Sequence, residues 1–203
     1  MQPDADWASI GDDWRRLYRP TIDSVTRGEV PWATFDALQL QMLEQVLGQH
    51  GVRGLSDEQV EQLSFVWRRM DPWPDVVPGL SRLKEQFIIC ALSNGSMAQL
   101  IALAKFGRIP WDGILSVEMF RAYKPDPRVY LGAAELLQLE PAEIMMVACH
   151  PYDIQAARTN GMQTAYVARP MEWGSQTHSE DPPAGTFDVL AADFEDLASQ
   201  LRT

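Results

Sequence analysis

Two short, continuous apolar runs constrain the fold of this chain more than any other feature. They cover residues 87–92 (FIICAL) and 144–149 (IMMVAC), and polar residues bound both of them. Neither run alternates with polar residues, so each is expected to be a strand buried on both faces, as in a parallel sheet covered by helices. Helical stretches separate the strands along the chain. The pattern predicts an α/β core with a doubly wound, Rossmann-like parallel sheet.

Weaker signals complete this core. Further strands are expected at residues 114–117, 164–168 and 187–190. Helices are expected at residues 97–106, 126–139, 152–160 and 193–201.

The first 70 residues carry helical signals instead. Apolar residues recur at three- and four-residue steps from Trp7 to Val25, which is typical of an amphipathic helix. Thr34 is expected to cap a second helix. Ser56 is expected to cap a third, with Gln59 completing a capping box.

A cluster of helix breakers follows this helical part. Residues 71–75 read DPWPD, and the pattern changes from helical to α/β beyond them. We therefore expect two domains, a helical one over residues 1–75 and an α/β core over residues 76–203.

Charge and cysteine usage exclude several classes of protein. The chain has 17 Lys and Arg against 28 Asp and Glu, a formal net charge of −11, whereas affinity for nucleic acid comes from clustered basic residues. No apolar run approaches the ~18 residues of a membrane-spanning helix, and the first residues do not form a secretion signal. Cys90 and Cys149 lie inside the apolar runs, where we expect reduced core thiols. We predict a cytoplasmic protein with neither nucleic acid nor membrane as a partner.

Polar residues follow both apolar runs at the point where strand gives way to helix. Ser93 and Asn94 follow the first run, and a hydroxyl and an amide at a helix N-terminus suit an anion. His150 and Asp153 follow the second run. Caps and turns use the same residue types, so both interpretations stay open. Because the carboxyl ends of parallel strands form one ligand-binding rim, the functional interpretation predicts that these side chains converge.

Lys124 lies between these two junctions. It precedes Pro125, which holds the lysine backbone extended just ahead of another expected helix. A lysine is usually a solvated surface charge. The expected position at the same rim favours a role in the site.

Three segments, in this order, resemble the haloacid dehalogenase superfamily, and most closely its type II 2-haloacid dehalogenase-like branch. They are Ser-Asn-Gly at residues 93–95, Tyr-Lys-Pro-Asp-x-Arg-Val-Tyr at 123–130, and His-x-x-Asp at 150–153 after an apolar strand. The helical first third resembles the cap domain of that branch. Arg-Pro-x-Glu-Trp-Gly at residues 169–174 is a further likeness. The resemblance covers nearly the whole chain.

The resemblance implies a hydrolase that works in two steps. An aspartate on the first core strand displaces halide from carbon, or attacks phosphorus in phosphatase relatives, and water then cleaves the ester. Lys124 would keep that nucleophile ionised, and Asp153 would orient Lys124 or the water. His150 completes the expected catalytic set.

The resemblance also implies the residues that bind substrate. Ser93 and Asn94 would bind the substrate carboxylate or the leaving group. Arg15 would reach in from the cap domain to pair with the carboxylate, which a planar guanidinium suits well. The expected partner is a small-molecule acid.

Two departures from the family pattern bear on activity. Well-studied dehalogenases carry Ser-x-Asn where this chain has Ala148-Cys149-His150, which leaves the preferred acid and halide open. The Phe-Asp-x-Phe-Gly-Thr-Leu strand that carries the nucleophile is missing, since Asp4 and Asp6 follow no apolar run. We expect this chain to be truncated and inactive as it stands, or else its sheet to close by bringing the two long apolar strands together.

Three functions stay open. The first is hydrolysis of a carbon–halogen bond in a 2-haloacid. The second is a phosphatase of the same superfamily, which would need Mg²⁺. The acidic residue expected beside the strand end is replaced by Cys149 and His150, which leaves Asp153 alone as a carboxylate there. We therefore expect no metal and no cofactor. The third is a binding protein that kept the pocket without catalysis. A homodimer seam on the apolar stripe of the first helices is a further expectation.

Overall fold

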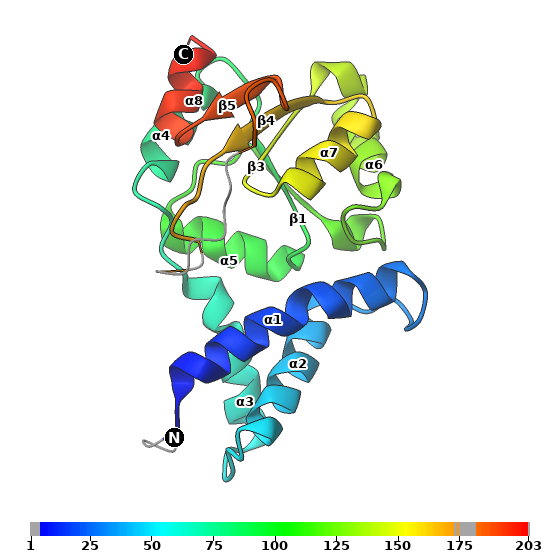
Figure 1. The fold of residues 1–203 in the computed structure, drawn as a ribbon, viewed down its shortest axis with the longest axis vertical. Coiled ribbons are helices and arrows are strands. Elements are labelled where there is room, and N and C mark those ends of the chain that lie inside the picture. Colours follow the sequence, from blue (N-terminus) through cyan, green and yellow to red (C-terminus); the bar gives the residue numbers. More distant parts are fainter. Residues whose placement is uncertain (1–4, 173, 175–181, 203) are drawn as a thin grey trace.

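The computed structural model describes residues 5–172, 174 and 182–202. In chain order the elements are α1 (Trp7–Thr26), α2 (Phe35–Gln49), α3 (Asp57–Ser64), η1 (Phe65–Arg69), α4 (Val76–Lys84), β1 (Cys90–Ser93), α5 (Met97–Gly107), β2 (Gly113–Ser116), η2 (Val117–Met119), α6 (Pro127–Leu137), η3 (Pro141–Glu143), β3 (Met145–Ala148), α7 (Pro151–Thr159), β4 (Gln163–Val167), β5 (Val189–Ala191) and α8 (Phe194–Gln200). Helices α1 to α3 gather at one end of the molecule, and the strands lie at the other (Figure 1).

Side-chain caps start the three N-terminal helices. Asp6 accepts a hydrogen bond from the Ser9 backbone N–H over 3.1 Å, so it caps α1. Thr34 caps α2, and Ser56 with Gln59 forms the expected capping box of α3. The helical expectation for this part of the chain is confirmed.

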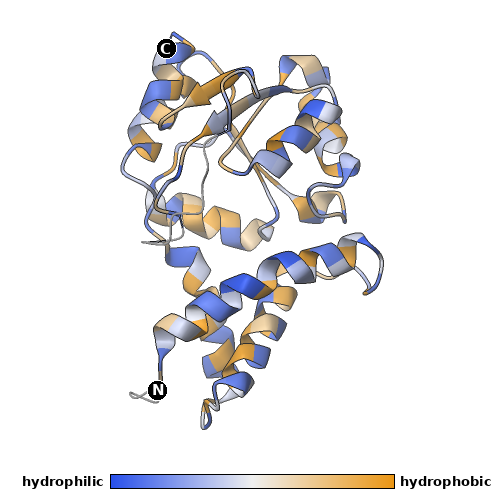
Figure 2. Ribbon diagram, in the orientation of Figure 1, coloured by the Kyte–Doolittle hydropathy of each residue, from blue (hydrophilic) through white to orange (hydrophobic). Residues whose placement is uncertain are grey.

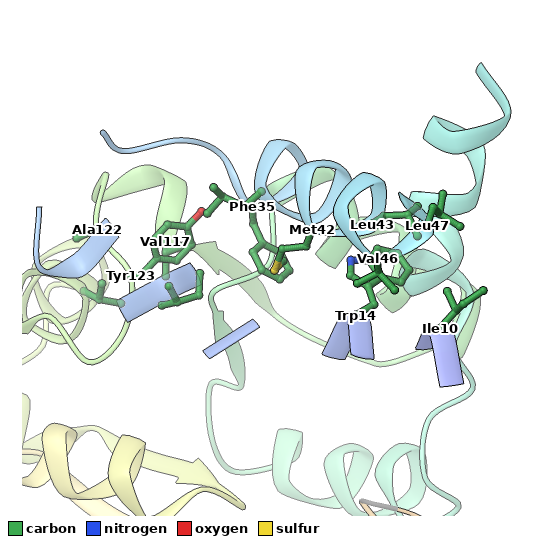
Figure 3. Packing of buried hydrophobic residues seen from close by; sticks show 13 residues of the cluster. Ile10, Trp14, Phe35, Met42, Leu43, Val46, Leu47, Val117, Ala122 and Tyr123 are labelled. Atoms are coloured by element: carbon green, nitrogen blue, oxygen red, sulfur yellow. The ribbon is translucent and has the colours of Figure 1, made fainter. Parts of the chain in front are cut away.

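One apolar cluster joins the helical end to the strand-bearing end. Trp14 of α1 and Val46 of α2 belong to it, and it continues to Val117, Ala122 and Tyr123 (Figure 3). Such burial removes apolar area from water at both ends at once, which stabilises their packing. The division into domains at residues 75 and 76 stays a prediction.

All strand pairs are parallel, as the apolar runs predict, but the strands form two sheets. In one sheet β1 pairs with β2, with Leu92 opposite Leu115. In the other the order is β3-β4-β5, with Val147 opposite Ala165. Within the described residues, β1 and β3 do not pair with each other. The expectation that the sheet closes by joining these two strands is therefore wrong.

The first strand is shorter than its apolar run. Phe87 and Ile88 precede β1, and their side chains are 44% and 73% exposed. The Phe87 N–H donates to the carbonyl of Leu83, so these residues continue the turn after α4. The backbone turn overrides the β propensity of the run.

Helices cover both sheets. Helices α4 and α8 pack together beside β4 and β5 in one apolar cluster, while α6 and α7 lie near β3 (Figure 1). Helix α5 is coloured largely as hydrophobic in Figure 2 and follows β1 directly. Among the described residues, no helix has the length and hydropathy needed to cross a membrane.

Candidate active site

The ammonium group of Lys124 lies between the end of β1 and the first turn of α7. Its Nζ donates to the carbonyl oxygen of Leu92 in β1 over 3.1 Å and to Asp153 Oδ2 over 2.5 Å. The side chains of Lys124 and Asp153 are 12% and 6% exposed. An ion pair buried this far needs further hydrogen bonds to offset desolvation. The sequence placed both residues at this rim, and the structure brings them into contact.

Tyr130 of α6 supplies one such hydrogen bond. Its hydroxyl donates to Asp153 Oδ1 over 2.6 Å, and its side chain is fully buried. Burial raises the pKa of Tyr130 well above its usual range, and the negative charge of Asp153 adds to this effect. Both oxygens of Asp153 therefore accept a hydrogen bond, and the carboxylate stays fixed against Lys124.

Asn94 ties the end of β1 to the backbone of Lys124. Its Oδ1 accepts from the Lys124 N–H over 2.9 Å, and its Nδ2 donates to the hydroxyl oxygen of Tyr18 in α1 over 2.9 Å. Burial raises the pKa of Tyr18 to about 12. The first helix thus contributes directly to the rim. Tyr18 was expected only as part of the apolar stripe, because helical periodicity cannot show which polar atom a helix presents.

Ser93 occupies the last position of β1 and shapes the turn that follows. Its Oγ accepts from the Gly95 N–H over 3.2 Å. The Gly95 carbonyl in turn accepts from the Ser116 hydroxyl over 2.7 Å. The hydroxyl acts as a turn cap here, which is one of the two interpretations that the sequence left open.

A second polar cluster surrounds Glu172. Arg15 of α1 donates to Glu172 Oε1 over 2.7 Å and to the Glu172 carbonyl oxygen over 2.8 Å. His150 Nε2 lies 3.0 Å from the same Oε1, and the Cys149 Sγ lies 3.7 Å from Oε2. Glu172 was not predicted as a site residue, although it lies inside the Arg-Pro-x-Glu-Trp-Gly segment.

The titration of this second cluster reflects its pairing. Hydrogen bonds with Cys149 and Glu172 raise the pKa of His150 to about 10. Burial alone would raise the pKa of Glu172, but its bonds with His150 and the charge of Arg15 lower it overall. Glu172 is therefore a carboxylate near neutral pH.

The two clusters share the start of α7. His150 is the N-cap residue of that helix, and Asp153 lies in its first turn. The ring of Tyr152 stacks on His150 with 5.6 Å between centroids, and the guanidinium carbon of Arg19 lies 4.3 Å from the centroid of the Tyr152 ring. Helix α1 therefore places three side chains against the two clusters. Arg15 contacts Glu172, Tyr18 contacts Asn94 and Arg19 contacts Tyr152.

The predicted residues fall into these two groups. Lys124, Asp153 and Asn94 form one connected network, with Ser93 next to it in the chain. Arg15 and His150 meet at Glu172 instead. The guanidinium of Arg15 binds Glu172 of its own chain, whereas the family resemblance implied a substrate carboxylate as its partner.

Cys90 and Cys149 are both free and half-buried. The prediction of unpaired thiols is confirmed, but Cys149 lies at the site and not deep in the core. Among the described residues, Cys149, His150 and Glu172 together could hold a metal ion, because their ligand atoms lie within 4.8 Å of one another.

The chain is similar in sequence to a known protein family and to several of its characterised members. A sequence model described as haloacid dehalogenase-like hydrolase matches residues 4–161. The (S)-2-haloacid dehalogenase 1 of Pseudomonas sp. strain CBS-3 is 30% identical over 141 residues, which are 68% of this chain and 62% of that protein. The (S)-2-haloacid dehalogenase 4A of Burkholderia cepacia is 31% identical over 120 residues, 58% of this chain and 50% of that protein. The chain therefore spans about half to three fifths of these curated relatives.

Solved structures agree over the full length of this chain. A crystal structure of an L-2-haloacid dehalogenase has a TM-score of 0.94 and 38% identity, covering 100% of this chain and 86% of that one. A defluorinating L-2-haloacid dehalogenase has the same TM-score of 0.94 and 39% identity, covering 100% and 83%. With the family model matching most of its residues, the chain belongs to the haloacid dehalogenase-like hydrolase family.

Proposed function

We propose that this chain provides the site of a hydrolase of the 2-haloacid dehalogenase type, which cleaves the carbon–halogen bond of a small 2-haloacid through an aspartyl ester once a nucleophilic aspartate is supplied beside that site. The observation that carries the proposal is the buried pair of Lys124 and Asp153, with Asn94 bound to the Lys124 backbone. A fixed cation at the carboxyl ends of the strands stabilises the negative charge that a carboxylate nucleophile and a departing halide bring. The names of the relatives support the same substrate class.

The residues of the site divide between chemistry and binding. Lys124 keeps the attacking carboxylate ionised, and Asp153 holds Lys124 in position. Arg15 binds the substrate carboxylate by exchanging it for Glu172, to which it donates one hydrogen bond at the carboxylate and one at the backbone carbonyl. A free carboxylate can accept both hydrogen bonds from the planar guanidinium. His150 lies beside that exchange and faces the same carboxylate.

Among the described residues, Asp153 is the carboxylate that pairs with Lys124, and it has the positioning role, so the test must supply the nucleophilic aspartate. The test therefore uses two proteins, the 203-residue chain and the same chain with an added N-terminal apolar strand that ends in Asp. Halide is measured by ion chromatography after incubation with (S)-2-chloropropionate and with fluoroacetate. We expect the extended protein to release halide and the shorter chain to release none.

A matched pair of lysine variants tests the role of Lys124. In the extended protein, Lys124→Met should lower halide release by at least about 100-fold, because it removes the cation that stabilises the site's negative charge. Lys84→Met removes a lysine whose partner is Asp112 in a more exposed ion pair, and should leave the rate unchanged.

Other outcomes would assign a different function. Hydrolysis of p-nitrophenyl phosphate that depends on Mg²⁺, without halide release, would make the protein a phosphatase. Binding of a 2-haloacid by the extended protein without any turnover would make it a binding protein. Equal halide release by the Lys124 and Lys84 variants would contradict the role given to Lys124.

The partners follow from the same proposal. We infer a small-molecule acid as the ligand and a second copy of the chain as the protein partner. The proposed contact surface lies on α5 and η1, where Ile101, Phe106 and Val66 are exposed. It differs from the expected seam on the first helices, because the stripe residues Ile10, Trp14 and Ile22 are buried within the chain. Light scattering on the purified chain tests it, and a monomer at all concentrations would contradict it. The cytoplasmic location stays a prediction.

A further inference from the structure

We propose that Cys149, His150 and Glu172 form a binding site for a borderline-soft divalent cation of the Zn²⁺ class. The inference does not depend on the proposed hydrolase activity. It rests on the side chains that surround Glu172 and on the way in which Arg15 orients that carboxylate.

The three side chains lie close enough together to share one cation, because their ligand atoms lie within 4.8 Å of one another. The Cys149 Sγ lies 3.8 Å from the His150 ring nitrogens and 3.7 Å from Glu172 Oε2, and His150 Nε2 lies 3.0 Å from Glu172 Oε1. Zinc bonds of about 2.3 Å to sulfur and about 2.0–2.2 Å to nitrogen and oxygen imply ligand separations of roughly 3.3–3.6 Å. The two separations from Sγ lie within a few tenths of an ångström of this range. Glu172 meets Cys149 through Oε2 and His150 through Oε1, so a rotation of the carboxylate or of the imidazole brings one oxygen to both residues.

The donor set selects the class of cation. One thiolate, one imidazole and one carboxylate suit Zn²⁺ and Co²⁺, whereas Mg²⁺ and Ca²⁺ require oxygen ligands. The thiolate and the carboxylate together carry two negative charges, which balance a dication.

Arg15 fixes the carboxylate from outside this cluster. It holds Glu172 through Oε1 and through the backbone carbonyl, so Oε2 faces Cys149. Hydrogen bonds from a residue outside the ligand set orient a metal-binding carboxylate and limit its motion. The His150 side chain is 41% exposed, so the ring has room to turn its Nε2 toward a cation.

The two free cysteines of this chain provide a matched experiment, because only Cys149 belongs to the cluster. The full 203-residue chain is titrated with Co²⁺ alone, and the near-ultraviolet band for charge transfer from thiolate to cobalt is recorded. We expect one equivalent to bind, with the band present in the parent and in Cys90→Ser and absent in Cys149→Ser. Zn²⁺ added afterwards should displace the Co²⁺ and abolish the band. Circular dichroism checks that both serine variants are folded.

Two further variants test the other ligands. His150→Gln and Glu172→Gln should each weaken Zn²⁺ binding, measured by calorimetry, by at least about tenfold. His50→Gln is the matched control, because His50 pairs with Asp13 and not with the cluster, and should bind as the parent does. Absence of the band, a band that survives in Cys149→Ser, or Zn²⁺ affinity equal in the His150 and His50 variants would overturn the proposal.

Discussion

The hydroxyl of Tyr130 offers a sharp test of how the site is held. Tyr130→Phe removes one oxygen from a fully buried side chain and leaves the ring in place, so it creates almost no cavity. The change leaves Asp153 Oδ1 without the donor that lies 2.6 Å away. The hydroxyl also lies 3.4 Å from the Asp153 backbone carbonyl, so the change tests mainly the shorter hydrogen bond, which goes to the buried charge.

The size of the effect follows from the charge of the acceptor. A hydrogen bond to a charged group contributes about 1.5–3 kcal/mol to stability, and one to a neutral group about 0.5–1.5 kcal/mol. Tyr123 is the matched control, because it is 1% exposed and its hydroxyl donates to the neutral carbonyl of Ala33 over 2.8 Å. Tyr130→Phe should thus cost about 1 kcal/mol more than Tyr123→Phe.

Urea unfolding followed by circular dichroism measures both variants. Each should shift the midpoint without changing the slope, because neither alters the surface exposed on unfolding. At about 2–4 °C per kcal/mol for a chain of this size, Tyr130→Phe should lower Tm by about 3–12 °C. A loss for Tyr130→Phe equal to or below that for Tyr123→Phe would refute the claim that Asp153 is a fixed, charged acceptor.

Three further predictions concern ion pairs and packing. Asp153→Asn leaves the buried ammonium of Lys124 without its anionic partner and should lower the free energy of unfolding by about 3–5 kcal/mol. Asp112→Asn breaks the more exposed pair with Lys84 and should lower it far less. Equal losses in urea unfolding would contradict this prediction. Gly79→Ala should lower the free energy of unfolding by about 1–3 kcal/mol, because the new Cβ would lie 2.5 Å from the backbone of α8. Gly11→Ala in α1 places its Cβ where nothing lies within 4 Å, and should raise the free energy of unfolding by about 0.5–1 kcal/mol. Calorimetry measures both changes, and their opposite signs are the test. Burial would raise the pKa of Asp75, but hydrogen bonds from Arg169 and from the Phe194 backbone N–H lower it overall. The charged Asp75 therefore stabilises the fold at pH values above its pKa in the unfolded chain. This stabilisation is lost as the pH falls through its pKa in the folded chain. The stability difference between parent and Asp75→Asn should therefore shrink below about pH 4, and a difference that stays constant down to pH 2 would show that the charge is not responsible.

The sequence by itself determined the elements and the rim residues. Continuous apolar runs require burial on both faces, so parallel strands follow from local composition. Polar residues just beyond the strands meet at one rim because parallel strands end on the same side, and this holds for Lys124 and Asp153. The caps at Thr34 and Ser56 follow equally from local hydrogen bonding.

Only the tertiary structure decided which side chains pair across the molecule. Glu172 meets Arg15 although 157 residues separate them, and no local pattern records that contact. Tyr18 reaches Asn94 for the same reason. The separation of the strands into two sheets, with β1 and β3 unpaired among the described residues, also depends on long-range packing. Periodicity in the sequence determines on which face of its own helix or strand a side chain lies. Whether two such faces come into contact depends on how all the elements between them pack.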